Sequence, residues 1–157
     1  MNIPKNIKMV ITDFDGIFTD GTVIVHEDKT MSRKVSFKDV MGVSILVKNG
    51  YKVGIISGEK NSIIELIAEK FKLDDVYMDI RNKLEVLKEI LNRNNLTVDE
   101  VLYIGDDVND RECLEFVNTK FTVPNANKRI KEIPNIQITE AFGGDGAFRE
   151  IVDEIVI

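Results

Sequence analysis

Short apolar runs of strand length recur along the chain, and segments with a helical spacing of apolar residues separate them. The runs predicted as strands are residues 7–12, 51–56, 76–78, 101–104 and 121–123. The first, second and fourth are almost continuously apolar, as expected of strands that helices cover on both faces of a parallel sheet. The alternation of strands and helices therefore predicts an α/β fold with an open, doubly wound parallel sheet.

Three segments between or after these runs place apolar side chains on one face of a helix. The stripes are Ile63, Ile64, Leu66, Ile67 and Phe71; then Leu84, Leu87 and Leu91; and finally Phe148, Ile151, Val152 and Ile155. Open α/β sheets bind their ligands in the crevice beyond the carboxyl ends of the strands. Functional residues are therefore expected directly after predicted strands.

One stretch, roughly residues 22–37, interrupts the alternation. Residues 22–26 and 34–37 resemble two short strands around a polar turn at residues 27–29, which predicts a β-hairpin between the first strand and the first helix. Nothing else is long enough to form an inserted domain. We therefore expect a single domain over residues 1–157, without a cap domain.

The charge balance narrows the function classes. The 157 residues include 27 acidic and 21 basic side chains, for a net charge of −6, which argues against a nucleic-acid groove. No apolar run approaches the ~18 residues of a membrane span, and the single cysteine, Cys113, cannot form an internal disulfide. With no signal-peptide pattern at the start, we expect a cytoplasmic protein that binds neither nucleic acid nor membrane.

Two acidic clusters directly follow predicted strands: DFDG at residues 13–16, and GDDVND at residues 105–110. If these strands are neighbours, several carboxylates converge in one crevice, where crowded like charges need a cation to neutralise them. Oxygen ligands with no Cys or His nearby select a hard ion such as Mg²⁺. The alternative interpretation is that these aspartates serve only as helix caps and turn formers.

With these two clusters, the sequence resembles the phosphatases of the haloacid dehalogenase superfamily. DFDGIFTDG at residues 13–21 resembles the first motif of that superfamily, Ser57-Gly58 the second, Lys83 the third and residues 105–110 the fourth. The early hairpin, the missing cap domain and the glycine-rich tail at residues 143–150 resemble its capless branch. That branch dephosphorylates 3-deoxy-2-keto sugar acids, namely 3-deoxy-D-manno-octulosonate 8-phosphate and the nine-carbon KDN or N-acylneuraminate 9-phosphates.

The resemblance implies a role for each aspartate. Asp13 would attack phosphorus and become an aspartyl phosphate, while Asp15 would give a proton to the leaving sugar alkoxide and later take one from water. The carboxylates of Asp13 and Asp106 and the backbone carbonyl of Asp15 would hold Mg²⁺. Asp107 and Asp110 would orient these ligands and bound waters.

The resemblance also implies how the substrate is held. The Ser57 hydroxyl, the Gly58 N–H and the Lys83 ammonium would bind the phosphate oxygens. The residues expected to contact the sugar acid are Ser36, Lys38, Asp39, Glu59, Lys60 and Lys70.

Within this branch, Glu59, Lys60 and Lys70 resemble the nine-carbon enzymes, whereas Ile67 stands where both groups tend to carry an arginine. We therefore expect a nine-carbon 9-phosphate as the preferred substrate and the 8-phosphate next. In this family a hairpin-built barrel joins four subunits, so the resemblance implies a homotetramer in which the tail of one chain completes a neighbour's site.

Two other classes of protein are also compatible with parts of this pattern. A response-regulator receiver also combines a small α/β sheet with an acidic Mg²⁺ site and a lysine, but it lacks the DxDG signature. The chain also resembles the phosphatase-like, non-catalytic partner domain of some sialic-acid cytidylyltransferases. The presence of both Asp13 and Asp15 favours an active phosphatase over either alternative.

Overall fold

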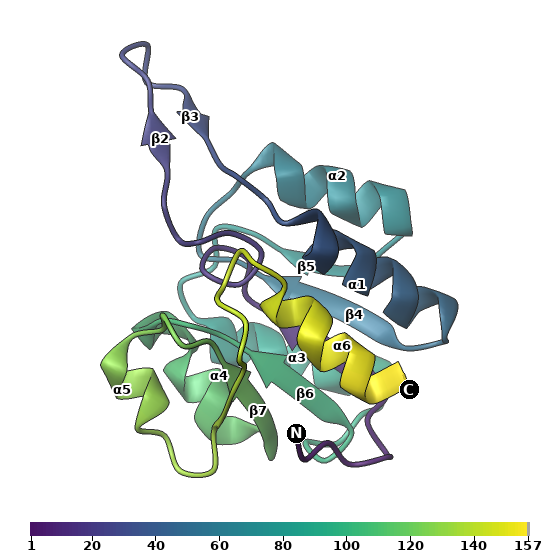
Figure 1. Ribbon diagram of the computed structural model, residues 1–157. Helices are drawn as coiled ribbons and strands as arrows, with labels where there is room; N and C mark the ends of the chain where they lie inside the picture. The colour runs from purple at the N-terminus through teal and green to yellow at the C-terminus, as the bar shows by residue number, and fades with distance from the viewer. Residues whose placement is uncertain (157) are drawn as a thin grey trace.

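The structure, a computed structural model, describes residues 1–156. Six parallel strands form the central sheet in the order β5-β4-β1-β6-β7-β8 (Figure 1). Their bounds are β1 Met9–Thr12, β4 Lys52–Ile56, β5 Asp75–Tyr77, β6 Val101–Ile104, β7 Thr119–Thr122 and β8 Gln137–Ile138. The chain starts in the middle of the sheet, builds one half through β4 and β5, and then builds the other half. This arrangement confirms the predicted doubly wound α/β fold; the two-residue strand β8 was not predicted.

The register of the sheet places the ends of three strands together. Thr12, the last residue of β1, lies opposite Ile55 of β4 on one side and Ile104 of β6 on the other. Because the strands are parallel, their carboxyl ends lie at the same edge of the sheet. Asp13 and Ser57, which follow β1 and β4, are thereby brought to one place.

Helices cover both faces of the sheet. On one face lie α1 (Phe37–Lys48), α2 (Ser62–Phe71) and α6 (Ala147–Val156), and Figure 1 shows α1 and α6 side by side. On the other lie α3 (Lys83–Asn94), α4 (Arg111–Phe116) and α5 (Lys128–Lys131). Side chains along β1 alternate between the two faces of the sheet and so contribute to two separate cores. Val10 packs against the first set of helices, and Met9 and Ile11 pack against the second. Within residues 1–156, no helix combines the length and apolar composition that crossing a membrane requires.

A two-stranded arm, residues 21–32, projects from the body of the molecule (Figure 1). Its strands β2 (Ile24–Val25) and β3 (Met31–Ser32) pair in antiparallel fashion, and every residue of the arm is exposed. The predicted hairpin is therefore present, but its second strand is not at residues 34–37. The alternating pattern there was misleading, because the Ser36 side chain accepts the Asp39 N–H and caps a helix that begins at Phe37.

The glycine-rich tail packs against its own chain rather than extending from it. The Gly144 N–H donates to the Ile17 carbonyl over 2.8 Å, and a Cβ atom at Gly143 would lie only 1.8 Å from the Gly16 carbonyl oxygen. This close approach to the loop after β1 requires glycine at position 143. The prediction that the tail reaches a neighbouring chain gains no support from these contacts, because residues 143 and 144 already line the loop beside their own acidic cluster.

Asp39 anchors the end of this tail. Its buried carboxylate accepts the Gly146 N–H over 3.1 Å and the Arg149 N–H over 3.0 Å, which joins α1 to the start of α6. Both carboxylate oxygens are thus used inside the chain. Asp39 is a buried cap for α6, so its predicted contact with the substrate gains no support from this geometry and stays a prediction.

Candidate active site

A buried lysine joins the two acidic clusters. Lys83 Nζ lies 2.9 Å from Asp13 Oδ1 and 2.8 Å from Asp110 Oδ1, and the lysine side chain has no exposed surface. Burial alone would lower the pKa of Lys83, but the carboxylates of Asp110 and Asp13 outweigh that effect and raise the pKa to about 12. Lys83 is therefore a permanent positive charge at the centre of the site, held at the first residue of α3.

Asp110 organises the loop that follows β6. Besides Lys83, its Oδ1 accepts the Tyr103 hydroxyl over 2.8 Å, and its Oδ2 accepts the N–H groups of Asp106 (3.1 Å) and Asp107 (3.4 Å). The Asp107 side chain in turn caps the 3₁₀ turn η1 (Val108–Asp110). Both oxygens of Asp110 are engaged by the protein, an arrangement suited to orienting its neighbours.

The cluster carries more acid than Lys83 can neutralise. Carboxylate oxygens of Asp13, Asp106 and Asp110 all lie within 4.8 Å of one another. Burial, followed by the charge of Asp110, raises the pKa of Asp13 well above its ordinary value, although Lys83 opposes the shift. Burial, Asp110 and Asp107 likewise raise the pKa of Asp106 to about 7. A bound cation would relieve this repulsion.

The donor set fits a hard divalent cation. Because Asp110 is occupied by hydrogen bonds, Asp13 and Asp106 are the carboxylates with oxygens left for a metal ion. Gly16 allows Asp106 to come this close, since a Cβ atom on Gly16 would lie 1.9 Å from Asp106 Oδ2. The backbone at Gly16, the residue after Asp15, therefore lies close to the Asp106 carboxylate.

Two adjoining pockets open above these carboxylates. The larger, of about 350 Å³, is lined by Asp13, Asp15, Ser57, Gly58, Glu59, Ile80, Arg81 and Asn109. The smaller, of about 170 Å³, is lined by Asp13, Asp15, Gly21, Asp106, Asp107 and Asn109. Asp13, Asp15 and Asn109 belong to both. Asp13 therefore shares the larger pocket with the Ser57-Gly58 turn and the smaller pocket with Asp106.

The Ser57-Gly58 turn is fixed by the neighbouring strand. The Ser57 N–H donates to the Tyr77 carbonyl over 2.8 Å, and the Ser57 carbonyl accepts the Ile80 N–H over 3.1 Å. A Cβ atom on Gly58 would lie 3.3 Å from Asn109 Nδ2, so the turn also packs closely against the second acidic cluster. The Ser57 hydroxyl donates to the Glu59 carbonyl over 2.8 Å, so the turn is held in place at the wall of the larger pocket.

The structure brings most of the predicted chemical residues together. Those that line the pockets or lie beneath them are Asp13, Asp15, Ser57, Gly58, Glu59, Lys83, Asp106, Asp107 and Asp110. These residues come from the ends of β1, β4 and β6 and from the start of α3, four segments that are remote in sequence.

Most of the predicted sugar-acid contacts lie elsewhere. Ser36 caps α1, Lys38 pairs with Asp145 over 3.2 Å, and Lys60 pairs with Glu65 over 3.8 Å. Lys70 lines a separate apolar depression between α1 and α2. None of these four side chains lines either acidic pocket, so their contact with the sugar acid stays a prediction that the pockets do not support. Glu59 is the one of the six that lines an acidic pocket.

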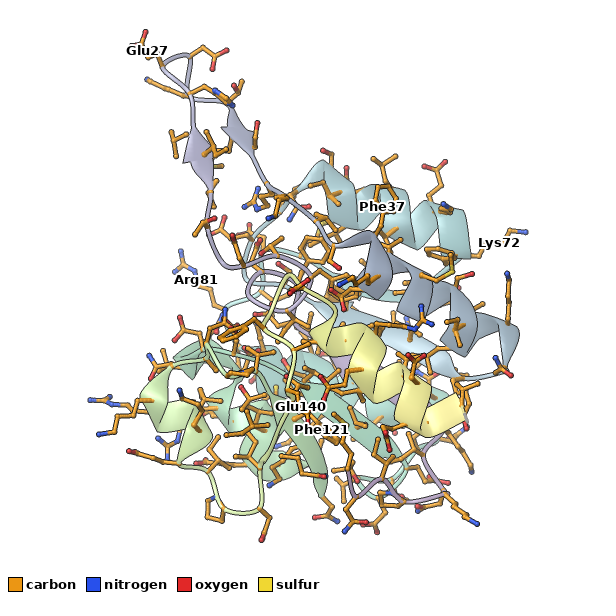
Figure 2. The ribbon with its side chains drawn as sticks, viewed as in Figure 1. Glu27, Phe37, Lys72, Arg81, Phe121 and Glu140 are labelled. Atoms are coloured by element: carbon orange, nitrogen blue, oxygen red, sulfur yellow. The ribbon has the colours of Figure 1, made fainter. Side chains whose placement is uncertain are left out.

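Sequence reasoning missed three polar residues at the site. Arg81 and Asn109 line the larger pocket, and Arg33, at the base of the arm, pairs with Asp15. Arg81 comes two residues before Lys83 and its side chain extends outward from the loop before α3 (Figure 2). That proximity to a motif residue was the available signal for Arg81, and Asn109 lies inside the fourth motif.

Comparison with known proteins agrees with this geometry. A family model described as haloacid dehalogenase-like hydrolase matches residues 56–151. The chain is 27% identical over 154 residues to 3-deoxy-D-manno-octulosonate 8-phosphate phosphatase of Escherichia coli K12, a match that spans 98% of this chain and 81% of the relative.

Solved structures of similar proteins share the fold closely. The 3-deoxy-D-manno-octulosonate 8-phosphate phosphatase of Moraxella catarrhalis, in complex with magnesium, phosphate and a KDO molecule, superimposes with a TM-score of 0.90. It is 26% identical, and the match covers 96% of this chain and 86% of that one. The cobalt-bound form of the corresponding Haemophilus influenzae enzyme gives a TM-score of 0.89 at 27% identity, over 96% and 88% of the two chains.

The chain therefore belongs to the haloacid dehalogenase-like hydrolases. The comparisons confirm the resemblance found in the sequence and the prediction of a phosphoric monoester hydrolase. The magnesium in the Moraxella catarrhalis structure and the acidic cluster found here agree with the predicted cofactor.

Because the folded pKa of Asp106 is raised to about 7 from an ordinary 3.8, metal-free folded protein binds more protons than unfolded protein between these values. Its stability should therefore fall as pH rises through that window, and Mg²⁺ should restore stability most at the alkaline end. Melting temperatures measured with EDTA and with Mg²⁺ at about pH 5 and about pH 8 test this. The Asp106→Asn variant, as the control, should show a smaller magnesium effect at both values. A magnesium effect that is larger at the lower pH would contradict the assignment.

Proposed function

We propose that the chain is a Mg²⁺-dependent phosphatase that removes the terminal phosphate of a 3-deoxy-2-keto sugar acid. One observation supports this proposal above all: Asp13, which is paired with Lys83, lines the same pocket as the Ser57-Gly58 turn. Asp106 lines the adjoining pocket, which Asp13 also lines. The names of the relatives, and the magnesium, phosphate and sugar acid in the Moraxella catarrhalis structure, support the substrate class.

In the proposed reaction the Asp13 carboxylate attacks phosphorus, and the bond between phosphorus and the sugar oxygen breaks. Asp15 gives its proton to that oxygen, so the sugar leaves as an alcohol. A water molecule then attacks the aspartyl phosphate; Asp15 takes its proton, and inorganic phosphate and free Asp13 are released. Asp13, Asp106 and the Asp15 carbonyl would hold Mg²⁺, whose charge lets an anionic nucleophile approach an anionic phosphate.

The other groups of the pocket hold the phosphate oxygens. The Lys83 ammonium lies beside Asp13, where it offsets negative charge that develops in the transition state. Ser57 and Gly58 line the same pocket as Asp13, and the Ser57 hydroxyl and the Gly58 N–H would bind further phosphate oxygens. An active phosphatase is favoured over a phosphoacceptor domain or a non-catalytic partner domain, because the proposed nucleophile, acid and phosphate-binding groups all lie in one place.

The sugar acid extends from the phosphate toward the mouth of the pocket. There Glu59 and Arg81 present a carboxylate and a guanidinium, which suit hydroxyl groups and the carboxylate of a sugar acid. Of the three residues that favoured a nine-carbon substrate, Glu59 alone lines the pocket. The nine-carbon preference thus stays a prediction that rests on Glu59, while the names of the relatives favour the 8-phosphate.

We also propose that the chain forms a homotetramer through its arm. Val23, Ile24, Val25 and Met31 expose 40, 64, 68 and 53% of their surface on a two-stranded ribbon with unpaired edges. An isolated two-stranded hairpin is marginally stable in water, and exposed apolar strands invite pairing with another copy.

Replacing Asp13 by Asn removes the nucleophile and one metal ligand while preserving the shape of the side chain. We expect phosphate release from both sugar acid phosphates to fall by about a thousandfold or more, with the fold intact by circular dichroism. A phosphate-release assay with Mg²⁺, and with EDTA as control, measures this. Substantial magnesium-dependent activity in the variant would refute the role of Asp13.

Replacing Glu59 by Arg should shift kcat/KM from the nine-carbon 9-phosphate toward the 8-phosphate, by a discrimination of ~1–3 kcal/mol. The reason is that the charge at the pocket mouth changes while the phosphate-binding groups stay in place. The matched control is Lys60→Glu, which alters the exposed neighbour that does not line the pocket. An equal substrate ratio in wild type and Glu59→Arg would show that Glu59 does not select the substrate.

If the arm joins four chains, light scattering over a concentration series should give four times the chain mass of 17.8 kDa. The double variant Ile24→Ser, Val25→Ser should lower that mass, because it removes apolar surface from the arm. Thr22→Ser, at the exposed base of the same arm, is the control. A wild-type particle of monomer mass at micromolar concentration would contradict the tetramer.

A further inference from the structure

An arginine closes the base of the arm over the acidic cluster. Arg33 follows β3 directly, and its side chain is 7% exposed although all residues from 21 to 32 are exposed. Its Nε donates to Asp15 Oδ1 over 3.1 Å. The arm therefore returns to the body of the molecule at a residue that touches the proposed acid and base of the reaction.

A second donor holds the same carboxylate oxygen. The Thr19 hydroxyl lies 3.3 Å from Asp15 Oδ1, and it also accepts the N–H groups of Gly16 (3.1 Å) and Gly21 (3.2 Å). Because two N–H groups point at the Thr19 oxygen, the hydroxyl proton is directed to Asp15. Oδ1 is thus fixed by Thr19 and Arg33, whereas Oδ2 makes no hydrogen bond within residues 1–156.

We propose that Arg33 is a positioning residue for Asp15. By holding Oδ1, Arg33 and Thr19 leave Oδ2 as the oxygen that exchanges a proton with the leaving group and with the attacking water. Asp15 lines both pockets and its side chain is 26% exposed, so without Arg33 the carboxylate has room to rotate away. This proposal rests on the proposed function, since it assigns Arg33 to the same proton transfer.

The proposal also gives the arm a role inside its own chain. The Ser36 N–H donates to the Phe18 carbonyl over 3.0 Å, so backbone contacts close the base of the arm just after Arg33. The position of Arg33 is therefore fixed from both sides, by β3 before it and by this contact after it. A change in the arm that moves Arg33 would therefore weaken its hydrogen bond to Asp15 and alter the position of that carboxylate.

A purely structural role for Arg33 makes a different prediction. If Arg33 only anchors the arm, its loss would lower activity whether or not Asp15 can transfer a proton. If it positions Asp15, its loss would have no effect once Asp15 is unable to act. A double-mutant cycle separates the two cases.

The cycle compares wild type, Arg33→Met, Asp15→Asn and the double variant in kcat for a sugar acid phosphate with Mg²⁺. Methionine keeps much of the buried side-chain volume, and Lys34→Met at the exposed adjacent residue is the matched control. We expect Arg33→Met to lower kcat by about tenfold or more with little change in KM, and Lys34→Met to stay within about twofold of wild type. In the Asp15→Asn background, Arg33→Met should have no further effect.

Equal losses from Arg33→Met in both backgrounds, or an unchanged kcat in the single variant, would overturn the proposal. If Arg33→Met fails to fold by circular dichroism, the same cycle is run with Arg33→Lys and Arg33→Gln. The lysine, which keeps the charge, should retain more activity than the glutamine, and the reverse order would count against the proposal.

If the wild type releases no phosphate from any sugar acid phosphate, the proposed function itself fails, and the proposed role of Arg33 fails with it. If the wild type is active and the losses from Arg33→Met and Asp15→Asn are additive, only the role of Arg33 is refuted.

Discussion

The salt bridges of one buried ammonium group hold the site together. Asp13 follows β1 and Asp110 follows β6, and Lys83 touches both from the first turn of α3. Buried carboxylates without a partner cost several kcal/mol each, so two clusters of aspartate side by side would separate or take up protons. Lys83 neutralises part of this negative charge. The pKa of Asp106 is still raised to about 7, because burial and the charges of Asp110 and Asp107 outweigh the effect of Lys83. The remaining negative charge is what makes the site suited to a divalent cation.

Close backbone packing keeps the aspartates in place around this lysine. Gly16 admits the Asp106 carboxylate, and Gly143 lies against the Gly16 carbonyl from the other side. The tail that carries Gly143 is in turn secured by Asp39 at the start of α6. A side chain at either glycine would collide with atoms of the site, so the geometry of the carboxylates depends on segments that take no part in the chemistry.

The fold and the meeting of the acidic segments at one edge of the sheet were predictable from the sequence, because they follow from periodicity and topology. Nearly continuous apolar strands imply a parallel sheet, and a parallel sheet brings residues that follow its strands to one edge. That reasoning, with the resemblance, located Asp13, Ser57 and Asp106. The strand expected at residues 34–37 was wrong because an alternating pattern does not reveal that Ser36 caps a helix.

Side-chain partners were less predictable than positions. Asp39 lies in a segment that resembles a ligand-binding motif but is a buried cap, and Lys38, Lys60 and Lys70 do not line the two acidic pockets. Arg33 was missed for the opposite reason, since a basic residue next to an exposed hairpin resembles a solvated one. Neither local pattern nor charge tells which of two such residues turns inward.

In the proposed reaction, Asp13 forms a covalent bond to phosphorus while Asp15 moves the protons. The most direct test treats the Asp15→Asn variant with p-nitrophenyl phosphate and Mg²⁺, because this leaving group needs little protonation while the second step still needs a base. After a rapid acid quench, mass spectrometry with fragmentation should find one phosphoryl group, on Asp13. A variant that turns over this substrate with no phosphoryl group on the chain, or with the group on another residue, would show that Asp13 is not the nucleophile.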